Sequence, residues 1–512
     1  MSAPCGARRG LPAAWLRGWR GDLLALGGGV LLPFAFSPFF WWPLAPLSIA
    51  AVFLAWCGAS PRRALWRGWL HGVASFGAGV WWIVESFRFS HIALPVAIVL
   101  TLGFIAFLAL YPALLGAALA RVAGGVPLGW RLAGVAPAAW VLGEWLRGWL
   151  LTGFTWLQLG YSQVDGPLAA LLPLAGVYGA GLAVAAAAGA LSWLALAPGM
   201  RTGLTLLGVL AGAALLAAIG ARPWTHPAGE PLRVALVQGN VPQDQKWLPQ
   251  MRVPTLQRYV ALSEPHFGVD LLVWPETALP GHLRTMAPFL EQLDRRAQAS
   301  GSAVLVGVPE YAGDPPRAYN SVRLVGSARG SYRKRHLVPF GEYLPLDTVL
   351  RPITRALGIP VSDFAAGAAR QQALVVAGHR VAVFICYEIA FGGEVVRALP
   401  EAGVLVTVSN DAWFGDSVGP HQHLQMARAR ALESGRALLR STNTGITALI
   451  DHRGRAVARL PQFQAAALAG RVSPRAGATP YVRTGDWPAL GLCVLVLLGA
   501  VPALRRAGGA RR

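Results

Sequence analysis

The stretch "VAVFICYEIAFGG", residues 381–393, decides how the second half of this chain is interpreted. It begins with five apolar residues, rich in β-formers, which predict a buried strand. Cys386 stands where this run ends, and Tyr387 and Glu388 follow it. Most free cysteines are small buried hydrophobic residues, so the stretch alone favours a packed thiol and leaves a nucleophile open. A nucleophile needs a base or a cation close by, which other parts of the chain must supply.

Further short, β-rich apolar runs surround this stretch, at residues 233–240, 270–276, 302–310 and 403–415. Helical or irregular stretches such as 288–300 and 423–439 lie between them. Strands that alternate with helices predict an α/β domain, which we assign to residues 229–485. Polar residues fall just past the predicted strands, where such domains build their sites; they are Glu276, Glu310, Cys386, Asn410 and Asp411.

The rest of the chain is typical of a membrane protein. Of the 512 residues 54% are hydrophobic and 13% are charged, and the mean hydropathy is +0.46. We predict eight transmembrane helices, most of them near the ~20 residues that cross a bilayer. Seven lie within residues 1–228 and the eighth within 486–512; they cover roughly 22–40, 43–59, 66–86, 92–120, 132–150, 169–197, 203–221 and 487–504.

Successive loops between these predicted helices are alternately rich and poor in arginine. Fourteen occur on the side that holds both termini, against only Arg88 and Arg147 on the other. Because positive residues favour the cytoplasmic side, both termini are predicted to be cytoplasmic and residues 229–485 to lie outside. This pattern accounts for the net charge of +21, and no basic helix or RNA-type motif predicts nucleic-acid binding.

Three separate elements have the residue types of cysteine chemistry: Glu276 in "LLVWPETALP", Lys334 with Glu342 in "YRKRHLVPFGEYLP", and Cys386. Glu276 is a candidate base, and Lys334 is a candidate cation for a thiolate or an oxyanion. Lys334 and Lys246 are the only lysines beside 43 arginines, and a lysine suits a tight site better than arginine does. Each element alone is more often a solvated glutamate, a surface cation or a core thiol.

Taken together, the order and spacing of these residues resemble the Glu-Lys-Cys triad of the nitrilase superfamily. Lys334 follows Glu276 by 58 residues, and Cys386 follows Lys334 by 52. Five segments around these residues are similar to the apolipoprotein N-acyltransferase family: residues 236–247, 274–280, 334–345, 385–392 and 409–448. The resemblance implies a nitrilase-like αββα sandwich inserted between transmembrane helices, in a polytopic α-helical membrane protein.

The resemblance also implies roles for individual residues. Glu276 is then the general base, Lys334 the cation that stabilises the oxyanion, and Cys386 the acylated nucleophile. Glu342 matches a supporting glutamate of the family, and Trp247, Tyr387 and Glu388 match residues that shape the acyl site. No cofactor is implied, and His421 and His423 lack a third ligand pattern for a metal.

The reaction implied by the resemblance is the last step of lipoprotein maturation in the bacterial inner membrane. An acyl chain passes from a phospholipid, with phosphatidylethanolamine expected as donor, through a Cys386 thioester to the amino group of a diacylglyceryl-modified N-terminal cysteine of an apolipoprotein. The catalytic domain is then periplasmic, and nothing in the sequence requires more than a monomer. Two alternatives stay open: a membrane-anchored amidase for a small amide, and a non-catalytic lipid-binding protein.

Overall fold

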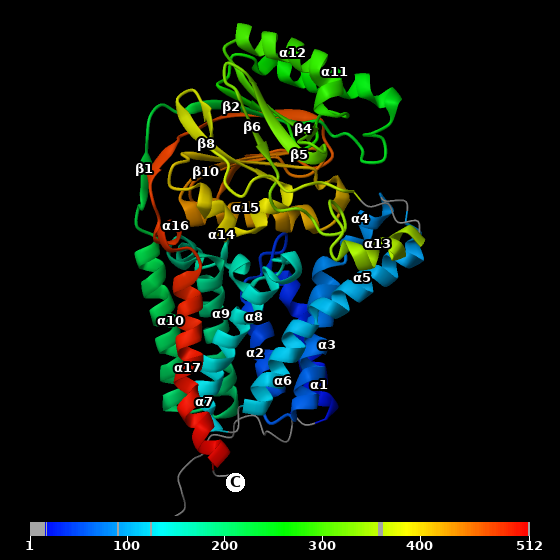
Figure 1. Ribbon diagram of the computed structural model, residues 1–512. Helices are drawn as coiled ribbons and strands as arrows, with labels where there is room; N and C mark the ends of the chain where they lie inside the picture. The colour runs from blue at the N-terminus through cyan, green and yellow to red at the C-terminus, as the bar shows by residue number, and fades with distance from the viewer. Residues whose placement is uncertain (1–15, 17, 90–91, 123–124, 357–361, 510–512) are drawn as a thin grey trace, which may run out of the picture. The chain divides into compact units, whose positions relative to one another are not determined.

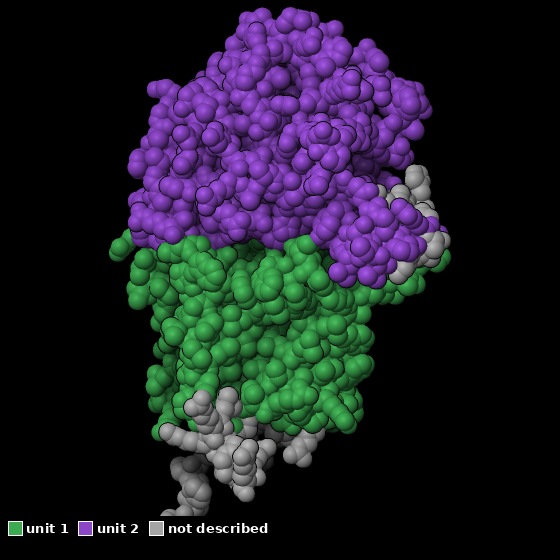
Figure 2. Space-filling view, in the orientation of Figure 1, with its two compact units in different colours: residues 1–81, 95–222, 484–512 green, residues 82–94, 223–483 purple. Residues whose placement is uncertain are grey.

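The computed structural model describes residues 16, 18–89, 92–122, 125–356 and 362–509. The chain divides into two compact units, which Figure 2 distinguishes by colour. Unit 1 consists of residues 1–81, 95–222 and 484–512, and unit 2 of residues 82–94 and 223–483. The second unit therefore contains the predicted α/β domain, together with a short segment from the first half of the chain.

Unit 1 is built of helices (Figure 1): α1 (Trp19–Leu31), α2 (Leu44–Trp56), α3 (Pro61–Val80), α5 (Leu94–Leu108), α6 (Leu110–Val122), α7 (Leu128–Trp130), α8 (Ala136–Arg147), α9 (Leu172–Leu196), α10 (Met200–Gly220) and α17 (Trp487–Gly509). Three helical stretches of the described chain are long and apolar enough to cross a membrane: Leu94–Val122, Ala169–Leu196 and Met200–Gly220. Leu44–Trp56 and Trp487–Pro502 are shorter apolar helices. The first half is thus helical and suited to a membrane, while the count of eight transmembrane helices stays a prediction.

Two predicted membrane helices differ in detail from the observed ones. The one at 22–40 ends as an α-helix at Leu31 and continues only as the 3-10 turn Leu32–Ala35, because Pro33 supplies no N–H for the next helical hydrogen bond. The one at 132–150 opens with a π-helical turn, Arg131–Val135, before α8. Both changes shorten the regular α-helix to 13 and 12 residues.

Unit 2 contains two six-stranded sheets. The first has the order β13 (Ala466–Val472), β2 (Leu232–Gln238), β3 (Leu271–Val273), β4 (Ala303–Ala312), β5 (Arg317–Gly326), β6 (Gly330–Arg333). The second has the order β12 (Ala456–Arg459), β11 (Ala448–Ile450), β10 (Ala437–Thr442), β9 (Val404–Ser409), β8 (His379–Ile385), β7 (Leu374–Val376). A separate short pair joins β1 (Thr225–Pro227) to β14 (Arg475–Gly477).

Helices cover the outer faces of both sheets, so that unit 2 has the layers α–β–β–α (Figure 1). On the first sheet lie α11 (Arg252–Ser263) and α12 (Leu283–Ala299), and on the second lie α14 (Gly392–Val395) and α15 (Gly419–Ser434). The other helices of this unit are α4 (Ile83–Arg88), α13 (Asp347–Ala356) and α16 (Pro480–Thr484). The predicted sandwich is therefore present as an architecture.

Apolar packing holds these layers together. Between the sheets lies a core of fully buried aliphatic side chains, which includes Leu236, Val273 and Val406. Helix α12 buries Met286, Leu290, Leu293 and Ala297 against the first sheet, a spacing of three and four residues that places them on one helical face. Burial of each such side chain contributes about 1.5–3 kcal/mol.

Strand direction brings the predicted site residues to one edge. Strands β2, β3 and β4 are parallel, and β6 has the same direction because β5 is antiparallel to both of its neighbours. Glu276 follows β3 and Lys334 follows β6, so both lie at the carboxyl edge of the first sheet. Cys386 follows β8 and Asn410 follows β9, which are parallel neighbours in the second sheet.

Two local predictions were wrong. Glu310 does not follow a strand but lies inside β4, opposite Tyr319, where it pairs with Arg333 and Arg323 instead of joining the triad. The predicted helical stretch 423–439 ends early, because Gly435 adopts φ +63° and terminates α15. The residues after it form β10, which is buried throughout.

The segment 82–94 belongs by its contacts to unit 2. Trp82 Nε1 donates to Gln422 Oε1 at 3.2 Å, and Ser86 Oγ donates to the Trp413 carbonyl at 2.9 Å. The Phe89 ring meets the Trp413 ring edge-on at 6.1 Å. This chain segment, which follows α3, is therefore held by the loop after β9 and by α15. The predicted boundaries at residues 228 and 485 stay predictions.

Candidate active site

An ion cluster lies at the carboxyl edge of the first sheet. Lys334 Nζ lies 2.9 and 2.8 Å from the two carboxylate oxygens of Glu342 and 3.7 Å from Glu276 Oε1. Lys334 is 1% exposed, so its charge has little water to stabilise it. Burial favours the neutral amine, but the charges of Glu342 and Glu276 outweigh it and raise the pKa of Lys334. The lysine is therefore a permanent ammonium at neutral pH.

Glu276 is fixed by hydrogen bonds to both of its carboxylate oxygens. Asn320 Nδ2 donates to Oε1 at 2.7 Å, and the Asn410 backbone N–H donates to Oε2 at 2.9 Å. The same Asn320 amide donates to Glu342 Oε1 at 2.9 Å. One side-chain amide thus bridges the two carboxylates that face Lys334 and limits their repulsion.

A chain of buried amides extends this support behind Glu276. Asn410 Nδ2 donates to Gln243 Oε1 at 2.7 Å, and Asn443 Nδ2 donates to Asn410 Oδ1 at 3.0 Å. Asn443 also holds the Val241 backbone N–H at 2.9 Å. The loop after β2 and the loop after β9 are therefore joined at the point where Glu276 is held.

Cys386 is half-buried and adopts φ +53°, a left-handed conformation that is unusual for a residue with a side chain. Burial and the charge of Glu276 raise the pKa of its thiol, while Lys334 acts in the opposite direction. The net shift is upward, so the thiol is protonated at rest. Both predicted partners, Glu276 and Lys334, thus act electrostatically on the sulfur.

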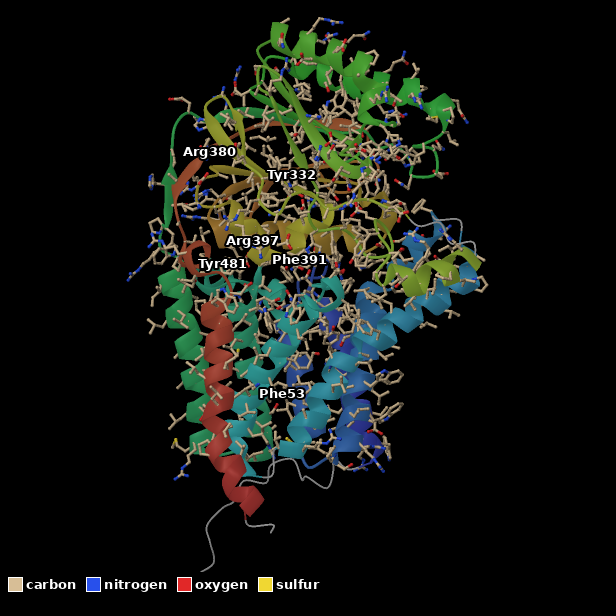
Figure 3. The ribbon with its side chains drawn as sticks, in the orientation of Figure 1. Phe53, Tyr332, Arg380, Phe391, Arg397 and Tyr481 are labelled. Carbon is tan, nitrogen blue, oxygen red and sulfur yellow. The ribbon has the colours of Figure 1, made fainter. Side chains whose placement is uncertain are left out.

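Glu388, two residues after Cys386, is fully buried. Its Oε2 accepts from the Ile385 backbone N–H at 2.7 Å, and its Oε1 accepts from the Arg335 backbone N–H at 2.8 Å. Tyr332, labelled in Figure 3, donates its hydroxyl to Oε1 at 2.9 Å. Burial raises the pKa of this carboxyl group although these hydrogen bonds oppose the shift. Glu388 thus ties the turn of Cys386 to the chain directly after Lys334.

The two predicted aromatic residues differ in their surroundings. Tyr387 is buried, with its ring edge-on to Phe391 at 5.0 Å and to His336 at 5.5 Å. Phe391, labelled in Figure 3, stacks on His336 at 3.8 Å. Trp247 is 51% exposed in the loop after β2. An exposed indole of this kind is free to meet an apolar substrate, whereas Tyr387 packs within an aromatic group.

The structure also assigns contacts to residues that sequence analysis missed or left undecided. Asn320 lies inside β5 and carried no local signal. Lys246, singled out only because lysine is rare, is 1% exposed, and its Nζ donates to Thr277 Oγ1 at 2.6 Å and to the Glu276 carbonyl at 3.4 Å. Lys246 therefore supports the backbone of the Glu276 loop.

Nothing in this cluster is suited to a metal ion, because its centre is the Lys334 ammonium. Within residues 18–89, 92–122, 125–356 and 362–509, no group of three His, Cys, Asp or Glu side chains is arranged to hold one. The chemistry of the described site residues is that of a thiol, a carboxylate and an ammonium.

Comparison with known proteins places the two halves of the chain in known families. Residues 233–481 match the carbon-nitrogen hydrolase family model, and residues 28–190 match the model of the apolipoprotein N-acyltransferase N-terminal domain. The apolipoprotein N-acyltransferase of Methylococcus capsulatus is 50% identical over 92% of this chain and 94% of its own length. Those of Azotobacter vinelandii and Pseudomonas aeruginosa are 46% and 44% identical, over 96% and 94% of this chain and 96% of their own lengths.

The α–β–β–α unit is thus a carbon–nitrogen hydrolase domain, carried by a chain whose first half is helical and apolar. Relatives that match over nearly the full length define the family more narrowly. The chain belongs to the apolipoprotein N-acyltransferase family.

We predict that Glu388→Gln slows the reaction of the Cys386 thiol by about 10²-fold, the loss expected when a reacting group is misplaced by roughly 1 Å. Both oxygens of Glu388 accept hydrogen bonds. The Gln NH₂ group would therefore face a backbone N–H, which leaves two donors in contact. The rate of alkylation of Cys386 by iodoacetamide measures this effect.

The matched control for this prediction is Glu401→Gln, since Glu401 is an exposed glutamate that pairs with exposed Arg380. We expect the alkylation rate of E401Q to equal that of the wild type. A normal alkylation rate in E388Q would show that the carboxylate does not position the nucleophile.

We also predict a pH-dependent contribution of Lys246 to stability. Burial lowers the pKa of Lys246 from its ordinary value of 10.5 to about 8. Between these values the unfolded chain binds a proton that the folded protein lacks, so stability rises with pH. Wild type should therefore gain up to about 3 kcal/mol relative to Lys246→Met as the pH rises from about 8 to about 10.5.

Melting temperatures of both proteins in detergent, recorded in steps across this pH range, measure the difference. A difference in melting temperature that stays constant with pH would contradict a buried, partly neutral lysine at this position.

Proposed function

We propose that this protein transfers a fatty acyl chain from a membrane phospholipid, through a thioester on Cys386, to the N-terminal amino group of diacylglyceryl-cysteine on apolipoproteins. The observation that carries the proposal is the buried cluster of Glu276, Lys334 and Glu342 acting on the Cys386 thiol. The names of the relatives, which match over nearly the whole chain, supply the substrate class.

The charges of the site favour a concerted first step. One ammonium and two carboxylates give the resting cluster a net charge of −1, so a free thiolate would add a second uncompensated negative charge. We therefore propose that the thiol proton moves to Glu276 as the sulfur attacks the ester carbonyl. The oxyanion forms next to Lys334, and such stabilisation is typically worth about 3 kcal/mol of barrier. The lysophospholipid leaves as an alcohol with the proton returned from Glu276.

In the second step the acyl group moves from Cys386 to a different nucleophile, the amino group of the acceptor. The neutral α-amino group of the lipidated cysteine attacks the thioester carbonyl, and Glu276 accepts a proton from the nitrogen. The C–S bond breaks, the amide forms, and Cys386 recovers its proton. Water has to be kept from the thioester meanwhile, because hydrolysis would lose the acyl group. The exposed Trp247 and the buried Tyr387 are proposed to shape the acyl site.

The proposed location of the protein follows from where its proposed substrates lie. Both acyl donor and acceptor are held in a bilayer by their acyl chains. We propose eight transmembrane helices in the bacterial inner membrane, cytoplasmic termini, and a periplasmic catalytic domain with boundaries near residues 229 and 485. Phosphatidylethanolamine is the proposed donor, and the enzyme is proposed to act as a monomer without a cofactor.

Mass spectrometry of the purified protein after incubation with phosphatidylethanolamine tests the proposal. We expect a fatty-acyl adduct on the peptide that contains Cys386, and release of this adduct when a diacylglyceryl-cysteine peptide is added. Cys386→Ala should form no adduct. Cys493→Ala, which changes a buried cysteine of α17, should form it normally.

The same experiment separates the alternative functions. Turnover of a small amide without any acyl adduct would favour the amidase. Neither adduct nor turnover in a folded protein would favour a lipid-binding protein.

A further inference from the structure

A second buried polar cluster contacts the backbone of Cys386, and the proposed acyl transfer does not yet use it. It consists of His423 on α15, Asp411 in the loop after β9, and Arg440 on β10, all of which are inaccessible to solvent. His423 Nε2 lies 3.1 Å from the carbonyl oxygen of Cys386 itself. The cluster thus contacts the backbone of the residue that carries the thiol.

The partners of His423 determine which of its nitrogens carries a proton. A carbonyl oxygen only accepts hydrogen bonds, so Nε2 is the donor to Cys386. Nδ1 lies 3.2 Å from the Arg440 guanidinium and 3.1 Å from Asp411 Oδ1. Burial and the charge of Arg440 lower the pKa of His423, while Asp411 acts in the opposite direction. Nδ1 thus has both a donor and an acceptor beside it, and Nε2–H faces the Cys386 carbonyl whether or not Nδ1 carries a proton.

Asp411 orients the arginine in turn. Its Oδ2 accepts from Arg440 at 2.6 Å, and its Oδ1 accepts from Ser409 Oγ at 2.6 Å. Burial raises the pKa of Asp411, but Arg440, His423 and Ser409 together outweigh it and lower the pKa, so this carboxylate stays ionised. The ring of Phe414 lies edge-on to His423 at 5.9 Å and limits the rotation of the imidazole.

The conformation of Cys386 explains why its carbonyl needs a partner. Left-handed backbone at a residue with a side chain is disfavoured and persists only where the surroundings hold it. Glu388 holds the N–H of Ile385, the residue before Cys386, and His423 holds the carbonyl of Cys386 itself. Both restraints come from side chains that are fully buried. Together they restrain the backbone on both sides of Cys386 and so the direction of its Cα–Cβ bond.

We propose that His423 is a positioning residue for the thioester chemistry: its Nε2–H holds the Cys386 carbonyl so that the sulfur stays aligned with Glu276 and Lys334. A histidine that served only to fill the core would be satisfied by any partner, whereas here the partner is the nucleophile's own backbone. This inference rests on the proposed function for its substrate, but not for its geometry.

Two near-isosteric substitutions test it: His423→Gln keeps an N–H donor near the Nε2 position, and His423→Met does not. Three measurements are made on full-length protein in detergent: the rate of Cys386 alkylation by iodoacetamide, the rate of acylation by phosphatidylethanolamine with its KM, and the melting temperature. His421→Ala is the control, because His421 lies on the same helix and contacts Gln462 instead.

We expect H423M to lose about 10²-fold in both rates, as for a nucleophile misplaced by about 1 Å, with KM unchanged. We expect H423Q to recover most of this loss and H421A to match the wild type. Equal rates in H423Q and H423M would overturn the proposal, whatever the change in melting temperature. If H423M does not fold, His423→Ala replaces it in the same comparison.

The alkylation assay keeps this inference distinguishable from the proposed function. A wild-type protein that forms no acyl adduct would contradict acyl transfer, yet its alkylation rates would still report on His423. A wild-type protein that forms the adduct, together with an H423M variant that reacts equally fast, would contradict only the positioning role.

Discussion

The rest of the site depends on one buried ammonium. Lys334 is enclosed so completely that only the carboxylates of Glu342 and Glu276 can stabilise its charge. These two carboxylates would repel each other without the Asn320 amide that donates to both. An arginine would not fit this position, because its planar guanidinium group needs more space than a compact ammonium does. This explains a lysine in a chain that otherwise uses arginine almost everywhere.

The same surroundings act on the Cys386 thiol. Burial and the charge of Glu276 raise its pKa, despite the opposing charge of Lys334. The thiol is therefore protonated at rest, and in the proposed reaction it passes its proton to Glu276 as the sulfur attacks.

Sequence analysis predicted the parts of this site that depend on local pattern. Apolar β-rich runs that end in polar residues were sufficient to predict β3, β8 and β9. Together with the family resemblance, these runs singled out Glu276, Lys334 and Cys386, which the structure brings together. Asn320 could not be found in this way, because it lies within a strand and acts only through residues distant in sequence. The φ of +53° at Cys386 likewise has no glycine to indicate it.

The arginines from which the membrane topology was predicted show a similar limit of sequence analysis. Arg67 is one of the fourteen arginines on the predicted cytoplasmic side, yet it is 2% exposed and pairs with Asp22 inside the helical unit. Arg147 is also buried and donates to the carbonyls of Phe154 and Trp156. The position of an arginine near the end of a predicted helix does not show whether its side chain faces solvent or is buried. In the buried case the side chain binds backbone carbonyls between helices, and this depends on packing that cannot be inferred from the sequence.

The active-site residues come from two different sheets, and this is the reason that so many buried hydrogen bonds surround them. The apolar core between the sheets is non-directional and by itself would allow one sheet to shift on the other. Directional bonds cross this interface at several points: Asn410 N–H to Glu276, Arg335 N–H to Glu388, and Ser441 Oγ to the Val237 and Val273 carbonyls. Each breaks if the sheets slide by a fraction of a residue, and each costs free energy when left unpaired in the interior. The polar network therefore fixes the register between the sheet that carries Glu276 and Lys334 and the sheet that carries Cys386.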